Sequence, residues 1–305
     1  MKSAGKALGV VVTGWAAWRL FGPEVPRRYP MPQVRPLRVP GRSVFVGERE
    51  YFVREAGPEG ADPVVLIHGW SLDAEMTYHR VVPELATRYR VVLPDLRNHG
   101  KSDWVRGRYD VADVADEVAG VLDALRLPAA TIMGYSLGGM VAQELARRYP
   151  HLVKQIVLAA TAARPVPTRR VLARTAFWLG RALARVSTHE GAALTEGALR
   201  HSNALEPSHR RWAHESLMRR DGELFYEAGA AAIRFDSRDW VGKLRVPVTV
   251  VIPTQDLLVP TAAQRELAAL IPHADVIELT GAGHESILTR ADEYLALLDK
   301  LMTAG

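Results

Sequence analysis

From residue 43 onward, short apolar runs alternate with longer amphipathic segments. Residues 63–69, 90–95 and 154–160 are mostly apolar, as is typical of strands buried on both faces. Residues 111–127 place apolar side chains at helical spacing. Further strands are expected at 43–47, 51–57, 129–134, 246–256 and 274–281, and further helices at 74–88, 137–150, 260–271 and 290–302. This alternation predicts an α/β fold, with a mostly parallel sheet and helices on both faces.

The alternation stops between residues 163 and 240, where the spacing is helical and no strand is expected. This stretch follows the sixth expected strand and precedes the seventh. It therefore predicts a helical cap at 163–240, inserted into an α/β core made of residues 43–162 and 241–305.

Residues 1–42 form a basic arm. They hold eight lysines and arginines against Glu24, a net charge of +7 in a chain whose total is +5. Within the arm, residues 7–18 are almost entirely apolar. A basic arm with an apolar segment indicates an anionic membrane surface as partner. The arginines that follow the segment favour a location on the cytoplasmic side of a membrane.

Three interpretations of residues 7–18 stay open. As a helix the segment would rise only about 18 Å, against a bilayer core of roughly 30 Å. An uncleaved anchor or interfacial helix is favoured over a signal peptide, because Trp15 and Trp18 crowd the only small residues that could form a cleavage site. The third interpretation is a helix that packs on the protein.

The amino-acid composition excludes several kinds of site. The chain has no cysteine, which excludes disulfides, a cysteine nucleophile and thiolate metal sites. It shows no interleaving of aromatic and basic residues, and no zinc-finger spacing, so nucleic acid is not an expected partner.

The segment GYSLG, residues 134–138, follows an expected strand and opens an expected helix. A serine between two glycines on such a turn is the arrangement of a nucleophile elbow, with its hydroxyl exposed at the end of a sheet. The helix N-terminus also favours developing negative charge. Ser136 is therefore the predicted nucleophile, and Tyr135 beside it is expected to help shape the substrate pocket.

A serine hydroxyl needs a base, and the base needs an acid to orient it. His284 follows the expected strand at 274–281, and Asp256 ends the segment at 246–256. Ligands of a parallel sheet bind at the carboxyl ends of its strands, where both residues are placed. His284 is the predicted base and Asp256 the predicted acid. The oxyanion would be held by the amides of Leu137 and Trp70, the latter in HGW at the end of the third strand. The indole of Trp70 is also expected to line the acyl pocket, as a second substrate-binding residue beside Tyr135.

Five motifs together resemble the α/β-hydrolase family from about residue 43 to the C-terminus. They are, in the order of that family, HGW, DLRNHGKSD, GYSLGG, PTQDLLVP and GAGH. The resemblance implies an eight-stranded, mostly parallel sheet with a helical cap. It also implies hydrolysis of esters through an acyl-enzyme, with no metal and no cofactor. Ser136, Asp256 and His284 take the places of the triad, and Trp70 and Leu137 those of the oxyanion donors.

Members of the family that open epoxides or displace halide carry Asp at the nucleophile position, whereas this chain carries Ser136. The resemblance is strongest to capped carboxylesterases, monoacylglycerol-lipase-like enzymes and perhydrolases. The sequence thus predicts a carboxylic ester hydrolase that acts on a small-molecule ester with an apolar acyl group. The alternatives are perhydrolysis or C–C bond hydrolysis on the same triad, or a hydrolase-like protein that only binds a small ligand.

Overall fold

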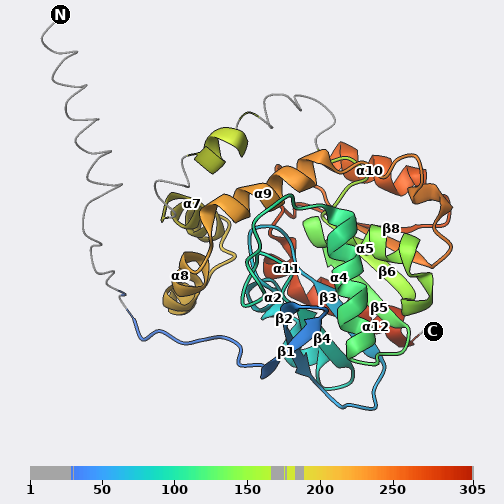
Figure 1. The fold of residues 1–305 in the computed structure, drawn as a ribbon, viewed down its shortest axis with the longest axis horizontal. Coiled ribbons are helices and arrows are strands. Elements are labelled where there is room, and N and C mark those ends of the chain that lie inside the picture. Colours follow the sequence, from blue (N-terminus) through green and yellow to red (C-terminus); the bar gives the residue numbers. More distant parts are fainter. Residues whose placement is uncertain (1–28, 30, 166–174, 176, 183–188, 304–305) are drawn as a thin grey trace, which may run out of the picture.

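The computed structural model describes residues 29, 31–165, 175, 177–182 and 189–303 (Figure 1). The apolar segment at residues 7–18 lies outside these described residues, so its three interpretations stay predictions. Within the described ranges, no helix is long and apolar enough to span a bilayer.

One sheet of eight strands forms the centre of the molecule, in the order β1-β2-β4-β3-β5-β6-β7-β8. β1 and β2 pair antiparallel, β2 also pairs antiparallel with β4, and all other neighbours are parallel. The strands are β1 (Gly41–Val46), β2 (Arg49–Ala56), β3 (Pro63–Ile67), β4 (Arg90–Pro94), β5 (Ala130–Tyr135), β6 (Val153–Ala159), β7 (Val248–Pro253) and β8 (Asp275–Leu279). The mostly parallel eight-stranded sheet predicted from the sequence is confirmed.

Two hydrophobic clusters cover the two faces of the sheet, because neighbouring side chains of a strand point to opposite faces. Val65 and Ile67 of β3 belong to the cluster beneath α4 (Val111–Ala124) and α5 (Leu137–Arg148). Val64 and Leu66 belong to the opposite cluster. That second cluster is covered by α2 (Ala74–Tyr78), α3 (Val82–Leu85), α11 (Ser286–Thr289) and α12 (Ala291–Thr303). α10 (Thr261–Leu270) packs on the first cluster.

The helix expected at residues 74–88 is two short helices, α2 and α3, separated by a turn. Pro83 lies in the first turn of α3. Proline has no amide hydrogen and clashes with the carbonyl four residues earlier, so it is tolerated at a helix start and not in its interior. A single helix was thus the wrong interpretation at this one place.

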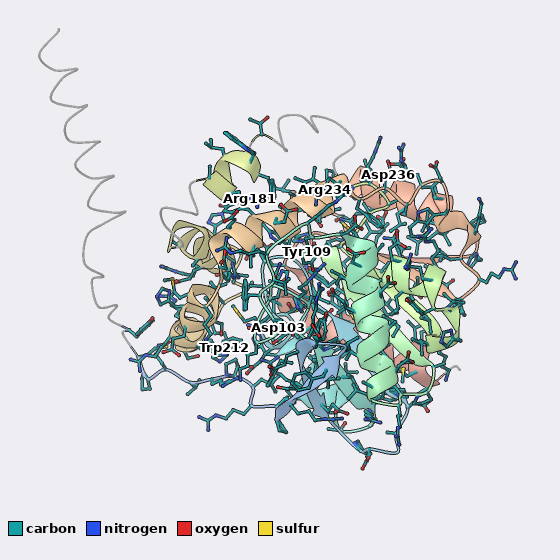
Figure 2. The ribbon with its side chains drawn as sticks, in the orientation of Figure 1. Asp103, Tyr109, Arg181, Trp212, Arg234 and Asp236 are labelled. Atoms are coloured by element: carbon teal, nitrogen blue, oxygen red, sulfur yellow. The ribbon has the colours of Figure 1, made fainter. Side chains whose placement is uncertain are left out.

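The stretch between β6 and β7, residues 163–240, is called the insertion below. Its longest helices are α7 (His189–His201), α8 (Arg210–Met218) and α9 (Gly222–Arg234). Residues 177–182 are also helical, a 3₁₀ helix (Pro207–His209) precedes α8, and no strand occurs in the described part of the insertion. Trp212 of α8, labelled in Figure 2, belongs to the second hydrophobic cluster, and Ala228 of α9 belongs to the first. The insertion therefore reaches the cores on both faces of the sheet.

The chain just before β1 ties the insertion to the core. The Gln33 amide donates to the Pro207 carbonyl at 3.1 Å and accepts from the Arg211 amide at 3.0 Å, both at the start of α8. Two residues on, Arg35 forms a two-fold ion pair with Glu75 of α2, at 2.7 and 2.5 Å. Glu75 is buried, so this pair is better shielded from solvent than a surface one.

Candidate active site

Ser136 lies on a sharp turn between β5 and α5. Its backbone has φ 54° and ψ −117°, a conformation that costs energy for any residue with a side chain. The turn is crowded on both sides: a Cβ on Gly134 would lie 2.3 Å from the Gly138 carbonyl oxygen. A Cβ on Gly138 would lie 2.1 Å from the carbonyl oxygen of Ile67. Both glycines of the GYSLG segment are therefore required by close backbone contact.

We expect Gly138→Ala to destabilise the fold, because the obstructing atoms belong to the backbone of β3 and cannot rotate away. The expected loss in the free energy of unfolding is about 3 kcal/mol or more, measured by thermal and urea unfolding. Gly197→Ala in α7 is the matched control, since a Cβ there meets no atom within 4 Å. It should leave stability unchanged or raise it by up to about 1 kcal/mol. Equal stability of the two variants would contradict the crowding argument.

Asp256 and His284 meet at the strand ends. Nδ1 of His284 donates to Oδ2 of Asp256 at 2.8 Å. The same oxygen accepts from the Gln264 amide at 2.9 Å, and Oδ1 accepts from the amides of Leu258 and Val259, each at 2.8 Å. The carboxylate is buried and held by four hydrogen bonds. This arrangement fixes the tautomer of His284 that leaves Nε2 as the proton acceptor.

Ser136 and His284 are not joined by a hydrogen bond in the structure, and Tyr135 is the residue that lies between their loops. The ring centroids of Tyr135 and His284 lie 5.7 Å apart, so the predicted base is adjacent to the residue that precedes Ser136. Among the described residues, neither Ser136 Oγ nor His284 Nε2 has a hydrogen-bond partner. Contacts between a nucleophile and its base are often loose before substrate binds.

The loop after β3 lies against Ser136. A Cβ on Gly69 would be 3.2 Å from Cβ of Ser136, which places the next residue, Trp70, beside the predicted nucleophile. In the described part of the chain, the amides of Trp70 and Leu137 donate to no protein atom. Leu137 opens α5, where backbone amides have no partner within the helix. The two predicted oxyanion donors are thus both free to donate.

The indole and the backbone carbonyl of Trp70 are both held by neighbouring residues. Its indole N–H donates to the Phe225 carbonyl at 2.6 Å, and the two rings stack with centroids 4.4 Å apart. Its own carbonyl lies 2.8 Å from Nε2 of His99. Phe225 belongs to α9, so the insertion directly holds the residue whose amide is predicted to bind the oxyanion.

His68 also orders this loop. Its Nε2 accepts from the Leu96 amide at 2.9 Å, and its Nδ1 lies 2.7 Å from the Gly69 carbonyl, which fixes one neutral tautomer. Burial lowers the pKa of His68 to about 4, so the ring stays uncharged at neutral pH. His68 therefore joins the loops that follow β3 and β4.

We expect the protein to lose stability as the pH falls from 7 to 5. Burial lowers the pKa of His68 and His79 to about 4, and that of His99 to about 3, from an ordinary 6.5. Below pH 6.5 the unfolded chain gains protons at these sites that the folded chain does not, so stability falls. Asp73 acts oppositely: burial raises its pKa to about 6, so its contribution is lost as the pH rises toward 6. Between pH 7 and 5 the three histidines change the stability in one direction and Asp73 alone changes it in the other, so the net stability falls as the pH falls.

Thermal unfolding between pH 5 and 7.5 measures this effect. His79→Gln should show a smaller fall in Tm than the wild type, because one of the three sites is removed. Its ring lies between the core and the insertion, 5.3 Å from that of Trp212, and touches no predicted site residue. A Tm that is independent of pH in the wild type would contradict the expectation.

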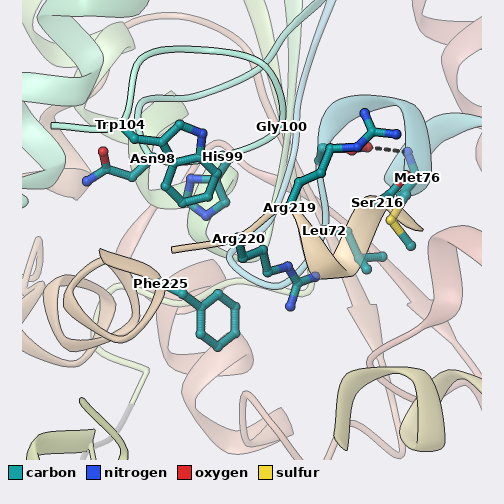
Figure 3. A pocket seen from close by; sticks show the side chains of 11 residues that line it. Leu72, Met76, Asn98, His99, Gly100, Trp104, Ser216, Arg219, Arg220 and Phe225 are labelled. Atoms are coloured by element: carbon teal, nitrogen blue, oxygen red, sulfur yellow. Dashed lines mark hydrogen bonds between the residues drawn. The ribbon is translucent and has the colours of Figure 1, made fainter. Parts of the chain in front are cut away.

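Two hollows border the insertion. The first lies between the loops after β3 and β4 and the α8–α9 turn, where Leu72, Trp104, Arg220 and Phe225 face one another (Figure 3). The second, of about 470 Å³, is lined by Phe177, Trp178 and Tyr226 together with the charged side chains of Arg181, Glu227 and Arg234. Figure 2 labels Arg181 and Arg234. Arg181 forms ion pairs with Glu223 and Glu227 at 2.8 and 2.6 Å, and Arg234 pairs with Glu227 at 3.1 Å, so apolar surface and paired charges occur together at the insertion.

Two contacts of the site carry no signal in the sequence. Gln264 orients Asp256 from the first turn of α10, and Phe225 holds Trp70 from α9. Both are ordinary residues of amphipathic helices when viewed alone. Only the packing of those helices shows that they support the site.

The sheet order and the strained serine turn are those of the α/β-hydrolase fold. The alpha/beta hydrolase fold family matches residues 62–291. The chain belongs to this family.

Two sequence relatives and one crystal structure show which kinds of protein the chain is similar to. The chain is 34% identical over 265 residues to a pimeloyl-[acyl-carrier protein] methyl ester esterase of Chromobacterium violaceum, covering 83% of this chain and 98% of that one. It is 29% identical over 264 residues to a non-heme chloroperoxidase of Streptomyces lividans, covering 79% and 91%. The crystal structure of an enol-lactonase from Burkholderia xenovorans LB400 superposes with a TM-score of 0.74 at 26% identity, covering 86% and 100%. The predicted class, a carboxylic ester hydrolase, agrees with the first of these names.

Proposed function

We propose that this protein is a serine-dependent carboxylic ester hydrolase, with Ser136 as nucleophile, His284 as base and Asp256 as the orienting acid. The observation that carries the proposal is the 2.8 Å contact between Asp256 and His284 at the strand ends, beside a serine on a strained turn. Each group needs the others to act: the serine needs a base, and the base needs a fixed tautomer.

The reaction follows from this arrangement. Ser136 Oγ attacks the acyl carbon while Nε2 of His284 takes the hydroxyl proton. The negative charge on the former carbonyl oxygen is met by the amides of Trp70 and Leu137. His284 then returns the proton to the leaving alcohol, and the acyl group stays on Ser136. A water molecule, deprotonated by His284, releases the carboxylic acid and restores the serine.

The proposed substrate is a methyl or other small-alcohol ester of an apolar acyl chain. The relative of 34% identity is named as an esterase for a methyl ester of an acyl chain on a carrier protein. The ring of Phe177 in the second hollow lies 5.1 Å from that of Trp70, between centroids, so the apolar side chains of Phe177, Trp178 and Tyr226 next to the proposed site support an apolar acyl group. We take the insertion, residues 163–240, as the cap that selects it.

The experiment that tests the proposal is mass spectrometry of the intact protein after reaction with a fluorophosphonate. A single adduct on Ser136 is expected, because only a serine activated by a base reacts at a useful rate. The Ser136→Ala protein should acquire none. An adduct of equal yield in both proteins would place the reactive group elsewhere.

A second activity on the same residues is perhydrolysis, favoured by the similarity to the Streptomyces lividans chloroperoxidase. In that reaction hydrogen peroxide, in place of water, would attack the acyl-enzyme and release a peracid. Comparing peracid formation from acetate and hydrogen peroxide with ester cleavage separates the two activities.

Residues 1–42 are proposed to bring the enzyme to an anionic membrane surface on the cytoplasmic side. Their net charge of +7 and the apolar segment at 7–18 support this partner. Sedimentation with anionic vesicles, compared between the full chain and a chain lacking residues 1–28, measures it.

A further inference from the structure

Tyr135, the last residue of β5, reaches from the serine turn to the loop that carries His284. Its side chain is buried, and its hydroxyl hydrogen-bonds the backbone carbonyl of His284. Ser286 Oγ lies 3.3 Å from the same hydroxyl, and 2.8 Å from the hydroxyl of Tyr294 in α12. Three buried hydroxyls thus form a chain that ends on the backbone of the predicted base.

The direction of this chain is determined at its end. A backbone carbonyl only accepts, so Tyr135 must donate to His284. Its oxygen can then accept from Ser286, which in turn accepts from Tyr294. Burial raises the pKa of Tyr135 and of Tyr294 far above the ordinary value, so both keep their donor protons at every pH of interest.

The chain complements the contact with Asp256. The carboxylate of Asp256 fixes the rotation of the His284 ring through Nδ1. It does not fix the backbone, which belongs to a loop between β8 and α11. Tyr135 supplies that restraint from a residue covalently joined to Ser136. The rigid tyrosine ring therefore links the position of the nucleophile to that of the base.

We propose that Tyr135 is a positioning residue that sets the distance between Ser136 and His284, with Ser286 and Tyr294 as its support. This inference rests on the proposed function. It differs from the sequence-based expectation that Tyr135 shapes the substrate pocket, because the hydroxyl is directed at the His284 loop.

Tyr135→Phe tests the proposal, since it removes only the hydroxyl. A misplacement of the base by a fraction of an ångström is expected to lower kcat about 10- to 100-fold. KM should stay within about twofold if no substrate contact is lost. The rate of fluorophosphonate labelling at Ser136 should fall in parallel with kcat, at a temperature where thermal unfolding shows the variant to be fully folded.

Tyr149→Phe is the matched control. Its hydroxyl donates to Asp116 at 2.9 Å, beyond the far end of α5, and should leave kcat and labelling unchanged. Ser286→Ala keeps the Tyr135 ring and is the second test if Tyr135→Phe does not fold. It should lower kcat in the same direction by a smaller factor.

The outcomes separate the two proposals. Folded Tyr135→Phe with wild-type kcat and labelling, in an enzyme that Ser136→Ala inactivates, would overturn the positioning role alone. A raised KM with unchanged kcat would overturn it in favour of a substrate contact. A wild-type protein that neither labels nor cleaves esters would instead overturn the proposed function.

Discussion

Ser136→Ala is expected to lower kcat/KM for a p-nitrophenyl ester by about 10⁴-fold or more. Alanine has no atom that can bond to the acyl carbon, so water is the only nucleophile left to His284 and the two proposed oxyanion amides. Stability should not fall, because the Ser136 hydroxyl has no hydrogen-bond partner among the described residues. Steady-state kinetics together with thermal unfolding measure both quantities.

The matched control for this variant is Ser43→Ala, an exposed serine on β1, the strand at one edge of the sheet. It should keep wild-type kcat/KM. If Ser136→Ala retained more than a few per cent of wild-type turnover, the nucleophile would have to be another residue or an activated water.

Asp256→Asn is expected to lower kcat by about 10⁴-fold. The carboxylate accepts four hydrogen bonds, from His284, Gln264 and two backbone amides. An amide side chain can accept on only one of its two terminal atoms. The two backbone amides cannot turn away, so the oxygen of the new asparagine is expected to face them and its NH₂ group to face His284, which then loses the acceptor that orients Nδ1.

The same substitution should also cost about 1 to 3 kcal/mol of folding free energy, because buried donors lose their acceptor. Kinetics and urea unfolding measure the two effects separately. Asp275→Asn, an exposed carboxylate at the start of β8, is the control and should change neither. A fully active Asp256→Asn enzyme would exclude Asp256 as the orienting acid.

Much of the fold could be predicted because its signals are local. Strand β3 is five consecutive buried residues, and the glycines around Ser136 are needed for contacts that the turn itself creates. The break at Pro83 was also a local signal, but the apolar spacing on both sides of it favoured one continuous helix. The helical spacing of apolar residues predicted one helix, whereas Pro83 predicted a break. The structure follows the proline.

The parts of the site that could not be predicted depend on tertiary packing. Phe225 and Trp70 are 155 positions apart, and Tyr135 and His284 are 149 apart. Strand-end rules indicate that loops meet at one edge of the sheet. They do not indicate which side chain of a helix will touch which loop residue, because that depends on how each helix docks.

The contact between α9 and Trp70 couples substrate access to catalytic competence. The stacked Phe225 ring and the indole hydrogen bond attach a residue of the oxyanion loop to the insertion. A movement of α9 that widened the way to Ser136 would therefore also displace the Trp70 amide that is proposed to stabilise the transition state. Substrate entry and the chemical step would then need different positions of α9. An ester would react only after α9 had returned to its contact with Trp70.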